Sequence, residues 1–151
     1  MRSIGETLSD FRAKGLLRFV PLYLMLLGLV LERSGHRALA LERFDEALRL
    51  VEITREKWCE AELHRRKGEL LRLEGHLEAA EKCLGKALAV AHQQSARVCE
   101  LRATTSLARL WRDQGKHAKA RDLLAPVYLW FTEGFDTPVL REAKALLDEL
   151  A

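Results

Sequence analysis

The feature that most constrains this chain is a motif that recurs every forty residues. The first copy reads GLVLERSGHRALALERFDEA over 28–47, and the second reads GELLRLEGHLEAAEKCLGKA over 68–87. The third reads ARLWRDQGKHAKARDLLAPV over 108–127. Glycine and alanine keep fixed places in all three copies, at Gly35, Gly75 and Gly115 and at Ala40, Ala80 and Ala120. Self-similarity with a period between about 20 and 50 residues indicates a repeat architecture.

Each copy of the motif has the pattern of a helix hairpin. The glycine suits the left-handed conformation that ends a helix, and the alanine allows the second helix to cross close to the first. We therefore predict an all-α solenoid of three hairpins over 16–56, 57–96 and 97–134. The last helix of the third hairpin is predicted over 116–132, with a kink at Pro126. Residues 135–151 are predicted to form a capping helix, with Asp136 or Thr137 as its N-cap and Pro138 as its first residue.

The N-terminal segment also follows the period. Three of its apolar residues stand forty positions before three others: Ile4, Leu8 and Phe11 precede Phe44, Leu48 and Val51. Their i, i+4, i+7 spacing predicts a helical apolar face, so residues 1–15 are interpreted as a partial repeat. The alternative is a short amphipathic N-terminal cap with no relation to the repeat.

The first predicted helix, over 16–34, is unusually apolar. Its longest uncharged stretch, Phe19–Leu31, has 13 residues, whereas a membrane-spanning helix needs about 20. A secretory signal is the alternative, but Glu32 and Arg33 follow at once and Ala38–Ala40 already fits the repeat. We therefore predict no membrane span and a cytoplasmic protein.

The composition offers no chemistry for catalysis. Three cysteines, Cys59, Cys83 and Cys99, have no CxxC spacing and form no metal-ligand set with the five histidines, so they are predicted to be buried, reduced thiols. No serine has the Gly-x-Ser-x-Gly setting of a nucleophile. We predict no enzyme activity, no cofactor and no metal. A net charge of +3 over 151 residues is too small to indicate nucleic-acid binding by itself.

The spacing of small and large residues resembles the tetratricopeptide repeat. That family has a small residue, glycine seven positions later, alanine five further on and a large residue four beyond, as in Gly28, Gly35, Ala40 and Phe44. The period here is forty residues rather than thirty-four. The resemblance implies paired helices and a role in binding proteins or peptides.

Three longer strings resemble the C-terminal helical tail of large bacterial regulators. These are KWCEAELHRRKGELL over 57–71, ELRATTSLARLWRDQGK over 100–116 and LLAPVYLWFTEGFDTPVLREAKALLDEL over 123–150. Those regulators join a cyclase or helix-turn-helix domain to a signal-transduction ATPase. This chain has no GxxxxGK[ST] loop, so the resemblance implies a regulatory or scaffolding module of a signalling protein without the ATPase chemistry.

Periodicity predicts a charged binding face on the first helices of the second and third hairpins. Its members recur at helical spacing: Arg65, Glu69, Arg72, Arg102, Arg109 and Arg112. Because guanidinium groups bind carboxylates in a bidentate manner, this face predicts an acidic protein or peptide partner. The competing interpretation is a solvated face of Glu/Arg pairs. Nucleic-acid binding through the same arginines is a further alternative, marked by a steep loss of binding with salt.

The apolar first helix predicts self-association at the N-terminal end of the chain. The residues assigned to this contact are Phe19, Leu22, Met25, Leu26 and Leu29. A large exposed apolar patch is rare on soluble monomers, so two copies are expected to meet there as a homodimer. The competing explanation is that a separate polypeptide covers this surface. We therefore predict a non-enzymatic interaction module, with a self-associating remnant of a larger regulator as the alternative.

Overall fold

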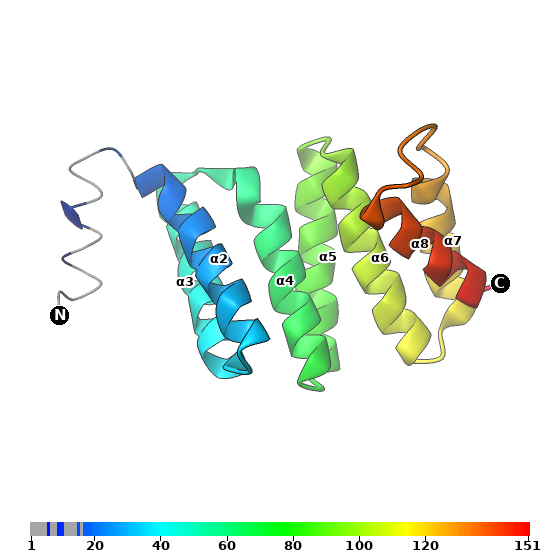
Figure 1. The fold of residues 1–151 in the computed structure, drawn as a ribbon, viewed down its shortest axis with the longest axis horizontal. Helices are drawn as coiled ribbons and strands as arrows, with labels where there is room; N and C mark the ends of the chain where they lie inside the picture. Colours follow the sequence, from blue (N-terminus) through cyan, green and yellow to red (C-terminus); the bar gives the residue numbers. More distant parts are fainter. Residues whose placement is uncertain (1–5, 7–8, 11–14, 16) are drawn as a thin grey trace. The chain divides into compact units, whose positions relative to one another are not determined.

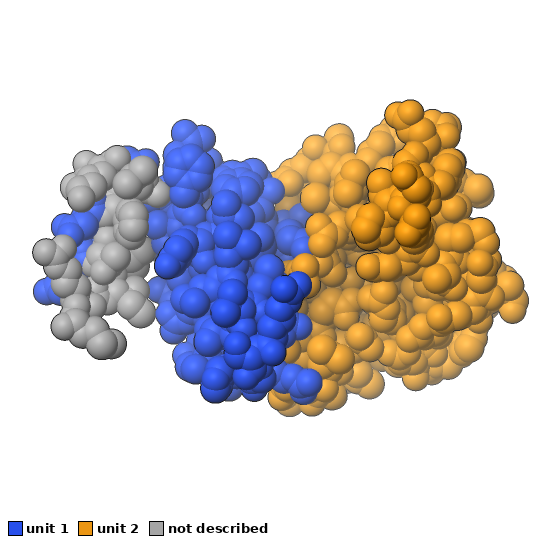
Figure 2. Space-filling view, in the orientation of Figure 1, with its two compact units in different colours: residues 1–63 blue, residues 64–151 orange. Residues whose placement is uncertain are grey.

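The computed structural model describes residues 6, 9, 10, 15 and 17–151. This part of the chain contains seven α-helices and no strand, which confirms the all-α class (Figure 1). The predicted partial repeat over 1–15 lies outside the described residues, apart from four positions. The chain divides into two compact units, Met1–Leu63 and His64–Ala151 (Figure 2).

The first unit is built around one helix hairpin. A 3-10 turn, Leu17–Phe19, leads into α2 (Val20–Arg33), and α3 (Arg37–Thr54) packs back against it. The helices approach closely where Gly28 meets Phe44, since a Cβ added to the glycine would lie 2.5 Å from Phe44 Cε1. The large aromatic ring therefore needs the glycine, which explains why the motif keeps a small residue there.

A second 3-10 turn, Lys57–Cys59, precedes α4 (Glu60–Leu73), whose residues from His64 onward belong to the second unit. That unit continues with α5 (Leu77–Gln93), α6 (Arg97–Asp113), α7 (His117–Tyr128) and α8 (Pro138–Glu149). α6 packs against both α5 and α7, while α8 lies on α6 and α7 (Figure 1). Gly68 repeats the role of Gly28, because its Cβ would lie 2.7 Å from Leu84 Cγ.

Residues with a left-handed backbone recur at a regular interval of twenty residues. Positive φ values occur at six positions with this spacing: Gly15, Gly35, Arg55, Gly75, Ser95 and Gly115. The Gly75 N–H donates to the Arg72 carbonyl, and the His76 N–H donates to the Leu71 carbonyl. These two hydrogen bonds satisfy carbonyl groups at the end of α4. The predicted role of Gly35, Gly75 and Gly115 is therefore confirmed. Arg55 and Ser95 adopt the same conformation without being glycine.

The largest difference from the predicted helix boundaries is in the third hairpin. α7 ends at Tyr128, two residues after Pro126, instead of continuing to Thr132. Proline cannot donate a backbone hydrogen bond and its ring crowds the preceding turn, so the helix ends near it. α8 begins at Pro138 after Thr137, as predicted, although the Thr137 hydroxyl donates to the Gly134 carbonyl and does not cap the helix.

No helix in the described part of the chain is both long enough and apolar enough to cross a membrane.

Candidate functional site

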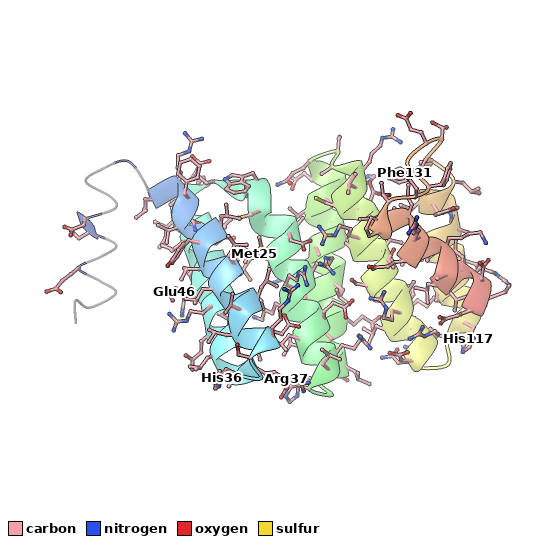
Figure 3. The ribbon with its side chains drawn as sticks, viewed as in Figure 1. Met25, His36, Arg37, Glu46, His117 and Phe131 are labelled. Atoms are coloured by element: carbon pink, nitrogen blue, oxygen red, sulfur yellow. The ribbon has the colours of Figure 1, made fainter. Side chains whose placement is uncertain are left out.

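The predicted charged face is a network of ion pairs within the second unit, here called the arginine network. Nitrogen-tipped side chains gather over α4 and α6 (Figure 3). Glu69 lies at the centre of the network. Its carboxylate accepts hydrogen bonds from Arg72 Nε at 3.0 Å and from Arg109 Nη1 at 2.9 Å. One carboxylate of α4 therefore holds an arginine from its own helix and another from α6.

Burial and hydrogen bonding act on the Glu69 carboxylate in opposite directions. The side chain is only 14 % exposed, and loss of water favours the protonated form. The Ser106 hydroxyl, Arg109 and Arg72 favour the charged form more strongly, so the pKa of Glu69 is lowered from its usual value. The network is thus a stabilised charge cluster that the fold has partly removed from solvent.

Further contacts of the network join residues about forty positions apart. Arg72 Nη1 lies 2.8 Å from Asp113 Oδ2, and Arg112 pairs with Glu149 of α8. Arg65 Nη1 donates to the Ser106 hydroxyl at 3.3 Å. Polar side-chain contacts therefore connect α4 to α6, and a further ion pair connects α6 to α8.

This arrangement changes what the predicted face offers to a partner. Arg65 is buried, with 8 % of the residue exposed, so it is not available on the surface as predicted. Arg72, Arg109 and Arg112 keep 18 %, 25 % and 28 % of their side chains exposed. They meet three carboxylates of the same unit, those of Glu69, Asp113 and Glu149, so the charges of these six groups cancel. The sixth predicted residue, Arg102, is half-buried on α6.

The predicted self-association residues are only partly exposed. Phe19 and Leu26 are 53 % and 50 % exposed, but Met25 is buried and Leu22 and Leu29 are half-buried. The assignment of Met25 to an exposed patch is therefore wrong. The sequence pattern placed the outward face of α2 about one residue away from its true position, because nearly every residue of this helix is apolar.

Four exposed apolar residues of α2 and the turn before it form a different set, here called the α2 stripe. Its members are Phe19, Tyr23, Leu26 and Val30, exposed to 53 %, 69 %, 50 % and 60 %. Their i, i+4, i+7, i+11 spacing places them on one side of the helix. Tyr23 and Val30 were absent from the predicted contact set.

The residues that stand forty and eighty positions after two members of the stripe differ from them in burial. Tyr23 corresponds to Leu63 and Ala103, and Val30 corresponds to Leu70 and Leu110. All four counterparts are buried, with at most 1 % of each residue exposed. The sequence shows that these positions are apolar in every copy but does not show that they are exposed on α2. Tyr23 and Val30 are thus exposed on α2 at positions that the later helices bury.

The second unit contains at least two cavities. One, of about 440 Å³, is lined by His92, Ser95, Arg97, Glu100 and Trp130. In it, His92 Nδ1 lies 3.2 Å from Glu100 Oε1, and the Arg97 guanidinium lies 5.4 Å from the centre of the Trp130 ring. These groups are already paired with one another.

The second cavity, of about 290 Å³, is mostly apolar and lies beside the 129–137 loop. Val98, Leu101 and Leu140 line it, together with Phe131, which lies near the first turn of α8 (Figure 3). Its polar side chains are the Glu133 carboxyl and the Thr137 hydroxyl, which donates to the Gly134 carbonyl.

The cysteines differ in environment. Cys59 is buried, whereas Cys83 and Cys99 are half-buried, so the prediction of three buried thiols holds for Cys59 alone. Burial raises the pKa of the Cys59 thiol to about 11. No cluster of three or more histidine, cysteine or acidic side chains able to hold a metal occurs in the described part of the chain.

Comparison of the sequence with protein-family models finds no matching family, and comparison with curated proteins finds no similar protein.

Proposed function

We propose that this protein is a non-enzymatic protein-interaction module built as a tetratricopeptide-like solenoid. Left-handed residues at twenty-residue intervals support repeated helix hairpins. The small residues that admit Phe44 and Leu84, at Gly28 and Gly68, support the same packing in successive repeats. A role in a cytoplasmic bacterial signalling regulator is what the sequence resemblance adds to this proposal.

The observation that carries the proposed function is the α2 stripe. Four large apolar side chains, each at least half exposed, lie along one side of a helix that has no charged residue from Phe19 to Leu31. Water contact with such a surface is unfavourable, at about 25 cal/mol for each Å² of apolar area. Contiguous apolar patches of several hundred Å² on soluble proteins mark interaction sites. The stripe is therefore proposed as the surface that binds a partner.

The proposal is tested by capture from the source cell. Purified wild-type protein and the double variant Tyr23→Glu plus Val30→Glu are immobilised, and the bound proteins are quantified by mass spectrometry. The matched control is Leu129→Glu, because Leu129 is 74 % exposed and lies in the other unit. At least one protein should be retained by wild type and by the control but lost with the double variant. If no retained protein depends on the stripe, the proposed function is wrong.

The arginine network is better explained as a stabilising feature than as a site for an acidic partner. Its exposed arginines are held by Glu69, Asp113 and Glu149, and an acidic ligand would have to displace these carboxylates. Charge reversal of Arg72 and Arg109 together should therefore lower the free energy of unfolding. If stability is unchanged and binding of an acidic partner is lost, the network is a binding face instead. Because these carboxylates neutralise the arginines, binding of nucleic acid to the network is also disfavoured, since such binding depends on uncompensated positive charge.

A homodimer through the N-terminal end stays open as the alternative use of the α2 stripe. Light scattering at micromolar concentration distinguishes a monomer from a dimer. In this alternative, the double variant Tyr23→Glu plus Val30→Glu converts a dimer to a monomer.

A further inference from the structure

We propose that the cavity of about 440 Å³ in the second unit binds a small zwitterion, namely a free α-amino acid with an apolar side chain. This inference goes beyond the proposed function, because the cavity and the α2 stripe belong to different units. The volume falls in the range of small-molecule sites, about 300–1,000 Å³. The lining supplies one positive group, one negative group and one aromatic surface, which are Arg97, Glu100 and Trp130.

The negative group is a buried carboxylate with a free oxygen. The Glu100 side chain is only 9 % exposed, and its Oε1 lies 3.2 Å from His92 Nδ1. Its second oxygen, Oε2, forms no hydrogen bond with any residue that the structure describes. Removal of a carboxylate from water is costly unless its oxygens are paired. The free oxygen therefore favours a ligand with several hydrogen-bond donors, such as an ammonium group.

The positive group has no carboxylate partner. Arg97 is exposed and forms no ion pair within the described part of the chain, and its guanidinium lies 5.4 Å from the centre of the Trp130 ring. This contact leaves N–H donors of the guanidinium available to bind a carboxylate in a bidentate manner.

The start of α6 adds further donors on the same side of the cavity. Ser95 and Arg97, which flank the N-cap residue Ala96, both line the cavity. No side chain caps this helix, so the first N–H groups of α6 lack an acceptor within it. Such groups bind anions, which favours the carboxylate of the ligand beside Arg97.

The spacing of the two charged residues suits an α-amino acid. Arg97 and Glu100 stand three residues apart on α6, so their Cβ atoms are neighbours at about 5–6 Å on one side of the helix. The ammonium and carboxylate of an α-amino acid are attached to one carbon atom and can therefore reach both partners at once. An apolar ligand side chain can then pack against Trp130, which is 44 % exposed.

The test uses L-phenylalanine as the probe and the full chain as the receptor, with binding measured by isothermal titration calorimetry at neutral pH. We expect a Kd between about 10 μM and 1 mM. Arg97→Gln should weaken binding at least about tenfold, because charge-assisted hydrogen bonds to the carboxylate are lost. The matched control is Arg141→Gln, which removes an exposed arginine that lines neither cavity and should leave the Kd unchanged.

Two analogues test the two charges of the ligand separately. 3-Phenylpropionate lacks the ammonium group and L-phenylalaninamide lacks the carboxylate, so each should bind at least about tenfold more weakly than L-phenylalanine. Glu100→Gln should remove the advantage of L-phenylalanine over 3-phenylpropionate, with circular dichroism as the check on folding. If this variant does not fold, the comparison of the analogues decides by itself.

Three results would overturn the proposal. These are no binding of L-phenylalanine up to about 10 mM, binding that Arg97→Gln leaves intact, and equal binding of L-phenylalanine and 3-phenylpropionate. The last result would show a simple anion site at the start of α6. The variant Tyr23→Glu plus Val30→Glu should leave the Kd unchanged, so the capture experiment decides the proposed function independently of this site.

Discussion

The helices α2 and α8 present opposite chemistry on their exposed sides. α8 buries Leu140, Ala143 and Leu146 and directs charged residues outward, including Lys144 and Asp148, which pair with each other. α2 exposes the four apolar residues of its stripe. Both α2 and α8 occupy the place of a first helix in the forty-residue period. Thr137, just before α8, lies forty residues after Arg97 at the start of α6. Contact with water is therefore favourable for the exposed side of α8 and unfavourable for the apolar exposed side of α2.

The two units also differ in how polar groups support the helices. The second unit has the arginine network, centred on Glu69. Forty residues earlier, the positions of Glu69 and Arg72 are occupied by Leu29 and Glu32, so the first unit lacks these charges. Apolar contacts alone are not directional, whereas the network fixes specific pairs of side chains. The predictions below test this contrast.

The largest effect is expected from a charge on the buried side of α8. Ala143 is fully buried, and Ala143→Arg should lower the free energy of unfolding by about 3 kcal/mol or more, because the long side chain must overpack the core or carry its charge inside. Val30→Arg, on the exposed stripe of α2, should change it by no more than about 0.5 kcal/mol. Urea titrations followed by circular dichroism measure both. Equal losses for the two variants would mean that the stripe is buried in solution.

The next effect compares two cysteines at equivalent positions of the repeat. Cys59 and Cys99 are forty residues apart, but Cys59 is buried with a raised pKa of about 11. At pH 8, about one Cys59 thiol in a thousand is ionised, and only the thiolate reacts. Iodoacetamide should therefore modify half-buried Cys99 at least about tenfold faster, as measured by peptide mass spectrometry. Faster modification of Cys59 would show that the 3-10 turn at Lys57–Cys59 opens readily.

The same raised pKa predicts a loss of stability in alkali. The unfolded thiol ionises near its ordinary value of 9.0, whereas the folded thiol stays protonated until about 11. The contribution is fully present below pH 9 and is lost as the pH rises toward 11. In Cys59→Ala, which lacks the thiol, the free energy of unfolding should depend less on pH in this range.

A smaller effect is expected when the centre of the arginine network is neutralised. Glu69→Gln should lower the free energy of unfolding by about 1–3 kcal/mol at pH 7, because Arg72 and Arg109 lose a charged acceptor. The lowered pKa of Glu69 makes this contribution present above the ordinary glutamate pKa of about 4.3 and lost as the pH falls through the folded value. The difference between wild type and variant should therefore shrink in acid. A difference that is constant with pH would assign the effect to packing.

The smallest effect concerns the left-handed residues. Ser95→Gly should raise the free energy of unfolding by up to about 1 kcal/mol, because glycine accepts its φ of 53° without the Cβ penalty. Gly75→Ser is the reverse substitution and should lower it by a similar amount, about 1 kcal/mol. Nothing lies within 4 Å of a Cβ added at Gly75, so packing does not enter. If the two substitutions change stability in the same direction, the helix ends are not controlled by this conformation.

Most helices of the fold could be predicted from the sequence because their determinants are local. Pro138 begins α8 and glycines 35, 75 and 115 end three helices through backbone preferences that need no tertiary contact. The early end of α7 also has a local cause in Pro126, where the sequence predicts a kink and the helix instead ends two residues later. The candidate surfaces were predicted less well. Periodicity identifies the side of a helix on which a residue lies, but it does not say what covers that side.

The sequence by itself thus determined the all-α class, the forty-residue spacing and the left-handed conformation of Gly35, Gly75 and Gly115. Only the tertiary structure decided that Arg65 is buried, that Arg72 and Arg109 share the carboxylate of Glu69, and that Tyr23 and Val30 are exposed while Met25 is not. The physical reason is that helix ends depend on residues adjacent in the chain. Burial and ion pairing depend on residues about forty positions away, which only the packing of one helix on another brings together.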